Sequence, residues 1–192
     1  MRMAEVKRQT KETDIEVKLI VDGEGKADVS TGIGFLDHML ITLARFSLLD
    51  IFLKAKGDLY VDQHHLVEDI GICLGQALDK ALGERKGIKR FGFAIAPMDE
   101  ALVLTSIDIS GRGGFWKDFS LKKTKVGGFE TETVEEFFRQ LAFNAKITLH
   151  LRLLSGDNLH HIIEAMFKSF AIALREAVRI EGEEIPSTKG MI

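Results

Sequence analysis

Apolar and polar residues recur along the chain in patterns that predict its first elements. Residues 14–21 alternate as a half-buried strand does, and Asp22-Gly23-Glu24-Gly25 follows as a turn. From Phe35 onward, apolar residues return with helical spacing through Leu43 and Phe46. Over this half, the pattern predicts helices at about 35–46 and 62–82, and strands at 14–21, 50–55, 88–96 and 101–109.

The second half of the chain repeats this order of elements. A helix opens at Thr133, a strand covers residues 147–154, and a long helix runs from about residue 158 to 180. Gly156-Asp157 ends the strand, as Gly57-Asp58 ends its counterpart. We therefore expect an α+β fold of two fused pseudo-symmetric repeats, about 1–95 and 96–192, each a sheet covered by helices, within one unit of residues 1–192.

The composition is that of an ordinary globular protein, and it excludes several classes. Of 192 residues, 45% are hydrophobic and 29% are charged, which is enough for a sizeable core. The net charge of −3 provides no basic field for nucleic acid or an anionic membrane, and no apolar run is long enough to cross a bilayer. The start of the chain lacks the apolar stretch of a secretory signal. The single cysteine, Cys73, excludes a disulfide framework within the chain, so we expect a buried, inert thiol and a cytoplasmic protein.

The histidines carry the most information about function. Four of the six form two copies of His-His-x-x-Glu, His64 to Glu68 and His160 to Glu164, each opening a helix after a Gly-Asp strand end. Residues four apart share a helix face, so the first histidine and the glutamate of each copy converge. Adjacent histidines point about 100° apart, so each pair addresses two different points.

Imidazole and carboxylate together suit Mn, Fe or Zn, and the absence of thiolates argues against a structural zinc site. One isolated His-His pair is more often a surface or capping feature than a metal site. Two copies at matching places in an internal repeat favour metal binding. The alternative is a pair of buried polar networks, although a core has little reason to repeat the whole motif.

Several strings resemble the imidazoleglycerol-phosphate dehydratase family, in order and over nearly the whole chain. They are residues 32–40 (GIGFLDHML), 62–69 (DQHHLVED), 97–102 (PMDEAL), 110–112 (SGR), 160–168 (HHIIEAMFK) and 186–190 (PSTKG). The resemblance implies a ribosomal-protein-S5-domain-2-like fold. It also implies dehydration of D-erythro-imidazole glycerol phosphate to imidazole acetol phosphate in histidine biosynthesis. That reaction would pass through a metal-bound imidazolate at a dinuclear site with two Mn ions per subunit, shared between the subunits of a 24-mer built from trimers. Fe or Zn could take the same ligands.

The resemblance also assigns residues to roles. Metal ligands fall on His38, His64, His65, Glu68, His160, His161 and Glu164. Substrate contacts fall on Glu12, Arg90, Arg112, Lys168, Ser187 and Lys189, with Thr188 in the same tail segment. The catalytic set is Glu12, His65, Glu68, His161 and Glu164.

Reaction chemistry makes sense of this assignment. The carbon attached to the ring must lose a proton, and cations can stabilise the charge that develops. Glu12 is the candidate proton acceptor, although it could also be an exposed strand carboxylate. Arginine, lysine, hydroxyl and backbone N–H groups suit the phosphate. Outside this set, we expect His150 to be a packed strand histidine, and Asp99 to serve either the turn or the site.

Three positions depart from the family pattern. Glu136 stands where the family usually has a histidine, and where His38 stands in the first repeat. We expect Glu136 to be a metal ligand through oxygen, the alternative being a helix-start carboxylate favoured by the helix dipole. Ile41 and Phe46 replace the usual Asp and His, which puts local contacts in doubt.

Two other classes of function fit parts of the sequence less well. A dinuclear metallohydrolase acting on a phosphate ester would explain the histidines and the basic residues, but not the ordered strings. A non-enzymatic metal-binding or shell protein would have no need of a phosphate-binding tail.

Overall fold

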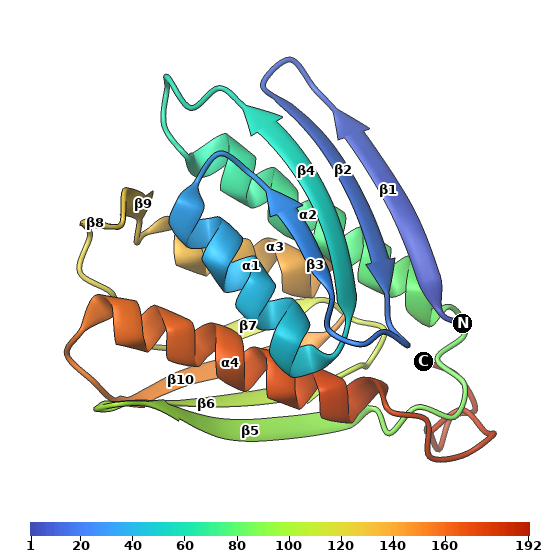
Figure 1. Ribbon diagram of the computed structural model, residues 1–192. Coiled ribbons are helices and arrows are strands. Elements are labelled where there is room, and N and C mark those ends of the chain that lie inside the picture. Colours follow the sequence, from blue (N-terminus) through green and yellow to red (C-terminus); the bar gives the residue numbers. More distant parts are fainter.

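The computed structural model describes residues 1–192 as two four-stranded sheets with four helices between them (Figure 1). The first repeat contains β1 (Met3–Gln9), β2 (Thr13–Ile20), β3 (Ala27–Ser30), α1 (Gly34–Ser47), β4 (Asp50–Gly57) and α2 (His64–Leu82). The second contains β5 (Phe91–Met98), β6 (Ala101–Asp108), β7 (Gly114–Asp118), α3 (Thr133–Asn144), β10 (Thr148–Ser155) and α4 (Leu159–Val178), with a small hairpin of β8 (Lys125–Val126) and β9 (Phe129–Glu130) before α3.

The two sheets have the same topology. Their strand orders are β1-β2-β4-β3 and β5-β6-β10-β7, and in each the short third strand pairs in parallel with its neighbour while the other pairs are antiparallel. The predicted α+β class, two related sheets covered by helices, is confirmed.

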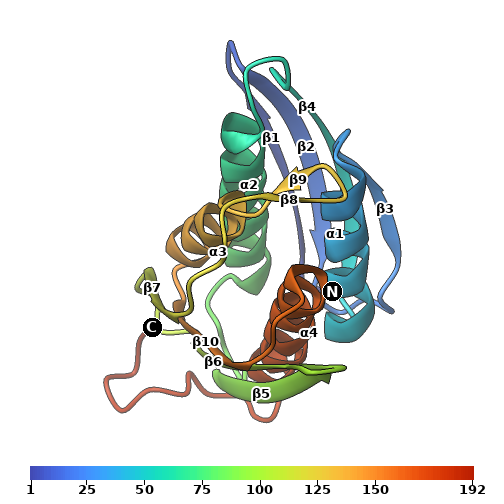
Figure 2. The same ribbon diagram turned by 90° about the vertical axis from the view of Figure 1, so that its left-hand side faces the viewer.

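Alternation along the strands decides which face is covered. In β2 every second residue, from Thr13 through Val17 to Leu19, is buried against the helices, and the residues between them face outward. The helices bury their apolar stripes between the sheets, so one continuous core runs through both repeats. Figure 2 shows the first sheet standing above the second, with the helices in the space between.

The helices pair across the repeats rather than within them. Helix α1 of the first repeat packs on α4 of the second, and α2 packs on α3. Gly71 and Gly75, one turn apart on α2, permit the close approach of α3. An added Cβ would lie 2.8 Å from the carbonyl oxygen of Phe137 at the first position and 2.7 Å from that of Leu141 at the second. This exchange of partners brings residues of both repeats together at each helix pair.

The structure corrects several details of the predicted elements. Strands β1, β3 and β7 were not predicted, because they are short or lie at sheet edges where fewer positions are buried. The predicted strand over 88–96 extends to Met98 in β5 and so includes Pro97, which an edge strand tolerates because one side of it needs no partner. The expected division at residues 95/96 falls inside β5, so we propose residues 83–90 as the junction of the repeats.

None of the helices is both long and apolar enough to span a membrane.

We predict that Gly75→Ala lowers the free energy of unfolding by about 1–3 kcal/mol, because the new methyl group meets the α3 backbone. Helix propensity alone would give the opposite sign, since alanine favours a helix over glycine by about 1 kcal/mol. Urea denaturation measures the change. Gly34→Ala, at the first residue of α1 with nothing within 4 Å of the added Cβ, is the control and should be neutral or stabilising. An equal effect of both substitutions would contradict the close approach.

Candidate metal centre and anion pocket

All four helices begin on the same side of the molecule (Figure 1). The two His-His-x-x-Glu motifs occupy the first turns of α2 and α4. Short polar side chains fix these turns: Asp62 accepts the backbone N–H of His64 at 2.8 Å, and Asn158 accepts those of His160 and His161 at 2.9 and 3.3 Å. The histidines therefore project from helix starts that are held by side-chain hydrogen bonds, from the N-cap Asn158 in α4 and from Asp62, just before the N-cap, in α2.

The first cluster, which we call the α1–α4 group, consists of His38, His160 and Glu164. One ligand atom from each of the three residues lies within 4.8 Å of the other two. The Oε2 atom of Glu164 is 3.5 Å from Nε2 of His38 and 3.2 Å from Nε2 of His160. The group combines a histidine of the first repeat with a histidine and a carboxylate of the second.

Glu164 is buried, and Lys168 Nζ lies 2.7 Å from its Oε1. Burial alone would raise the pKa of Glu164, but the hydrogen bond and charge of Lys168, with His38 beside it, hold that pKa below its usual value. The carboxylate is thus kept ionised, as a metal ligand must be.

The matching cluster, the α2–α3 group, consists of His64, Glu68 and Glu136. The imidazole Nε2 of His64 lies 3.8 Å from Oε2 of Glu68. The amide of Gln140 donates to Glu68 at 3.0 Å and to Glu136 at 2.7 Å, so one side chain holds the two carboxylates side by side. This group again joins both repeats, with Glu136 at the place that His38 takes in the first.

The second histidine of each motif, His65 or His161, belongs to neither of these groups and is hydrogen-bonded to a carboxylate outside them; we call the two the outward histidines. Nδ1 of His65 lies 3.0 Å from Asp58 Oδ2 and 3.8 Å from Glu12 Oε2. Nδ1 of His161 lies 2.7 Å from Glu100 Oε2. The hydrogen bonds to these carboxylates raise the pKa of both histidines, and the bond to His161 helps lower the pKa of Glu100 to about 2.

The β8–β9 hairpin connects the starts of α1 and α2. Gln63 donates to the carbonyl of Gly128 at 2.8 Å and accepts from the N–H of Glu130 at 2.9 Å. Phe129 stacks on Phe35, with ring centroids 5.6 Å apart. The hairpin, which belongs to the second repeat, therefore links the starts of the two helices of the first repeat, α1 and α2.

A separate pocket of about 330 Å³ gathers most of the predicted substrate contacts. It is lined by Arg90, Ser110, Gly111, Arg112, Ser187, Thr188, Lys189, Met191 and Ile192. With two guanidinium groups, an ammonium and hydroxyls, it suits an anion such as phosphate. Lys168, predicted to join this set, lies instead beside Glu164 and against Phe46, with Nζ 5.7 Å from the centre of that ring.

Arg90 connects the pocket wall to the C-terminal segment. Its Nε and Nη2 donate to the two carboxylate oxygens of Asp108, at 2.7 and 3.2 Å, and its Nη1 donates to the carbonyl of Pro186 at 2.9 Å. The hydrogen bond to Asp108 raises the pKa of Arg90 further above its already high value. Residue 186, and with it the segment that carries Ser187 to Lys189, is held where the pocket forms.

Four residues that orient the predicted site residues in the structure were not predicted from the sequence: Asp58, Glu100, Asp108 and Gln140. Glu100 and Asp58 stand inside motifs that were already quoted or counted as strand ends, so their carboxylates were a usable signal. Gln140 gave none, because its contact with Glu68 arises only where α2 and α3 meet. Asp108 stands in no motif, although the predicted pairing of the strands at 88–96 and 101–109 brings it close to Arg90.

The remaining predicted residues have plain roles in the structure. His150 is exposed on β10 and stacks on Trp116, with ring centroids 5.2 Å apart. Asp99 sits in the β5–β6 turn with φ at 48° and also lies 3.7 Å from Nε2 of His161, so it touches both turn and site. Cys73 is buried, which raises its pKa to about 11 and leaves an unreactive thiol. Ile41 and Phe46 are partly exposed on α1.

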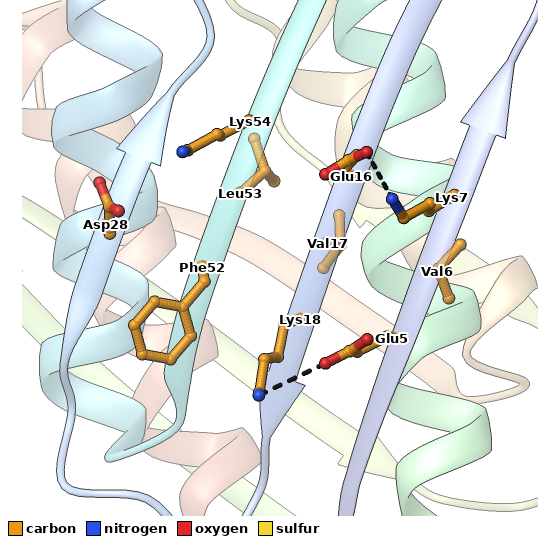
Figure 3. Close-up of a pocket in the computed structure, with 10 residues that line it drawn as sticks. All are labelled: Glu5, Val6, Lys7, Glu16, Val17, Lys18, Asp28, Phe52, Leu53 and Lys54. Atoms are coloured by element: carbon orange, nitrogen blue, oxygen red, sulfur yellow. Dashed lines mark hydrogen bonds and ion pairs between the residues drawn. The ribbon is translucent and has the colours of Figure 1, made fainter.

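Another hollow, of about 270 Å³, lies on the outer face of the first sheet (Figure 3). Its charges are largely matched, since Lys7 pairs with Glu16 at 2.7 Å and Lys18 with Glu5 at 3.3 Å. None of the residues predicted for the site lines it. It does not compete with the histidine clusters as the place of chemistry.

Comparison with known proteins decides the family. The family model described as imidazoleglycerol-phosphate dehydratase matches residues 31–174. The chain belongs to the imidazoleglycerol-phosphate dehydratase family. It is 58% identical over 194 residues to the imidazoleglycerol-phosphate dehydratase of Thermoanaerobacter sp. (strain X514), with both chains fully covered. It is 55% identical to that of Desulforudis audaxviator, covering all of this chain and 98% of the relative. The chain is therefore a dehydratase, a lyase of histidine biosynthesis.

Solved dehydratase structures share the fold. The enzyme from Staphylococcus aureus subsp. aureus N315 superimposes with a TM-score of 0.85 at 40% identity, covering 93% of this chain and 99% of that one. The enzyme from Pyrococcus furiosus, in complex with (S)-C348, also gives 0.85, at 44% identity, covering 97% and 100%.

We predict that Asp108→Ala in this dehydratase speeds tryptic cleavage after Lys189 by about tenfold or more, because Arg90 loses the partner that aims it at Pro186. Lys189 is the last tryptic site in the chain, so mass spectrometry follows the loss of three residues. Asp118→Ala, which breaks an exposed pair with Arg152 elsewhere, is the control and should leave the rate unchanged. Equal rates in both variants would mean that Arg90 does not hold the tail.

Proposed function

We propose that this dehydratase converts D-erythro-imidazole glycerol phosphate to imidazole acetol phosphate at a dinuclear metal centre, with two Mn ions per subunit. Two observations carry the proposal. The three ligand atoms of the α1–α4 group lie within 4.8 Å of one another, and in the α2–α3 group Gln140 holds Glu136 beside Glu68, which lies near His64.

The donor atoms of the α1–α4 group fit a metal ion. Bonds of about 2.0–2.2 Å place two ligands of one ion at most about 4.4 Å apart. The observed separations of 3.2 and 3.5 Å from Glu164 to the two histidines lie within that limit. Two imidazoles and one carboxylate, without thiolate, suit Mn, Fe or Zn.

Bound cations would hold the substrate imidazole and stabilise the negative charge that develops as the adjacent carbon loses its proton. In this proposal Glu12 accepts that proton. Its carboxylate is exposed and lies 3.8 Å from His65, while its carbonyl accepts the N–H of Asp58 at 3.1 Å. The side chain of Glu12 is therefore accessible to substrate, while its backbone is hydrogen-bonded to Asp58, at the end of β4 before the first histidine motif.

The phosphate end of the substrate would occupy the anion pocket. Arg90 has two of its five N–H donors left after binding Asp108 and Pro186, so it can anchor the tail and still face an anion. Arg112, Ser187, Thr188 and Lys189 add charge and donors. Lys168 belongs in this account beside Glu164, where it can keep the carboxylate ionised or reach the substrate.

The outward histidines support assembly of the site between subunits. His65 and His161 belong to neither group formed in their own chain, and the Nδ1 of each is hydrogen-bonded to a carboxylate, which leaves Nε2 available. We propose that each supplies Nε2 to a metal held by a neighbouring copy, within the 24-mer of trimers that the resemblance implies. The cytoplasmic location expected from the sequence belongs to the same proposal.

The test of the proposed function is purified protein with Mn and imidazole glycerol phosphate, followed for the keto product. Product without phosphate release supports dehydration, whereas phosphate release alone would indicate a metallohydrolase.

Lys189→Ala should raise KM by about 10- to 150-fold if its ammonium makes a buried charged hydrogen bond, equivalent to about 1.5–3 kcal/mol. An unchanged KM would remove Lys189 from the phosphate site.

Glu136 is proposed as a ligand of the second metal. Gln140 holds it beside Glu68, and a cation between the two carboxylates would relieve their mutual repulsion. We predict that Glu136→Ala loses about one of two metals per subunit, and that Glu136→His restores it. Metal analysis after dialysis decides, with Glu135→Ala as the neighbouring control. If Glu136→Ala keeps both metals as tightly as the parent chain, Glu136 is only a helix-start carboxylate.

A further inference from the structure

We propose that Asp58 and Glu100 are positioning residues that aim the outward histidines, and that the two repeats do this with residues that are not counterparts of one another. The inference rests on the proposed function, because it concerns how His65 and His161 are presented to metal.

In the first repeat the orienting group comes from the end of a strand. Asp58 follows β4, and its Oδ2 lies 3.0 Å from Nδ1 of His65. Its side chain is only 12% exposed, and its backbone N–H donates to the carbonyl of Glu12 at 3.1 Å. The other carboxylate oxygen, Oδ1, is buried with no hydrogen-bond partner. Because the only hydrogen bond of this buried carboxylate is to the imidazole of His65, Asp58 acts on the site through the position of that ring.

In the second repeat the orienting group comes from a hairpin turn. Glu100, between β5 and β6, places Oε2 at 2.7 Å from Nδ1 of His161. Its Oε1 accepts the backbone N–H of Asn158 at 2.9 Å, and its carbonyl accepts the hydroxyl of Ser155 at 3.1 Å. Glu100 is therefore fixed to the start of α4 itself, the helix that carries His161.

The difference follows from the length of the connection between strand and helix. Asp58 precedes His65 by seven residues, which lets the chain turn back and bring the carboxylate to the ring. Asp157, the matching strand-end residue, precedes His161 by only four. Asp157 is exposed, and its side chain makes no hydrogen bond in the structure. With the shorter connection, the neighbouring hairpin supplies the carboxylate instead.

The chemical consequence is the same in both repeats. An imidazole that donates its Nδ1–H to a carboxylate is held in the tautomer whose Nε2 carries the lone pair, and its ring cannot rotate freely. Nε2 is then the atom offered outward. Two further carboxylates lie within 4 Å of the rings, Glu12 at 3.8 Å from His65 Nδ1 and Asp99 at 3.7 Å from His161 Nε2, and both are too distant for a direct hydrogen bond. The charges of Asp62 and Glu164 also act on His65 and His161, respectively.

The test is a Mn titration of the full-length protein, read from the electron paramagnetic resonance signal of free Mn. Asp58→Asn and Glu100→Gln should each weaken one of the two metals per subunit by about 10- to 100-fold, and the double variant should weaken both. Asp157→Asn is the matched control, because the side chain of this strand-end residue makes no hydrogen bond, and it should bind Mn as the parent chain does. Asp58→Glu should recover part of the lost affinity, which a merely structural defect would not allow.

The outcomes separate this inference from the proposed function. If the parent chain binds no Mn, the metal centre itself is wrong. If the parent binds two and both variants bind as tightly as Asp157→Asn, the positioning role is wrong. Urea denaturation of each variant checks folding, and because the two substitutions lie in different repeats, a folding defect in one leaves the other to decide.

Discussion

The structure depends on the exchange of helix partners between its two repeats. Helix α1 packs on α4 and α2 on α3, so neither repeat can bury its own helices without the other. The same packing assembles the chemistry, because His38 meets His160 and Glu164 only where α1 crosses to α4. Gly71 and Gly75 show how closely the second pair must approach, since neither position has room for a Cβ. Folding of the chain therefore already brings together the residues of both repeats in the α1–α4 group.

The two repeats have the same arrangement of strands and helices, but they differ in the side chains around the histidines. Sheet order, parallel edge strand and helix pairing are the same in both halves. Around the histidines the halves differ: a carboxylate replaces a histidine at Glu136, and different elements supply the carboxylates beside His65 and His161. Such differences would make the two proposed metals inequivalent, one held with more carboxylate than the other. A repeated frame can hold this asymmetry because the differences lie in side chains and connections, not in the core.

Most of the helices and strands could be predicted because their apolar residues recur regularly along the sequence. The strand over 14–21 and the long helices alternate or recur strongly, and they match β2, α2 and α4 within two residues at most ends. Short edge strands such as β3 and β7 bury too few residues to leave a pattern. At the site, the doubled His-His-x-x-Glu motif pointed to the histidines that cluster. It did not predict that Gln140 would join Glu136 to Glu68, because that contact depends on the packing of α3 on α2. The contact of Lys168 with Glu164 was within reach of the pattern, because the two residues lie four apart on one helix.

The central claim is that each metal is held by residues from both repeats. Anomalous diffraction at the Mn absorption edge, from crystals of the Mn-loaded protein, tests it most directly. The account predicts two peaks per chain, one among His38, His160 and Glu164 and the other among His64, Glu68 and Glu136, each completed by an outward histidine of a neighbouring copy. A single peak, or a peak held by residues of one repeat alone such as Glu12, Asp58 and His65, would contradict it.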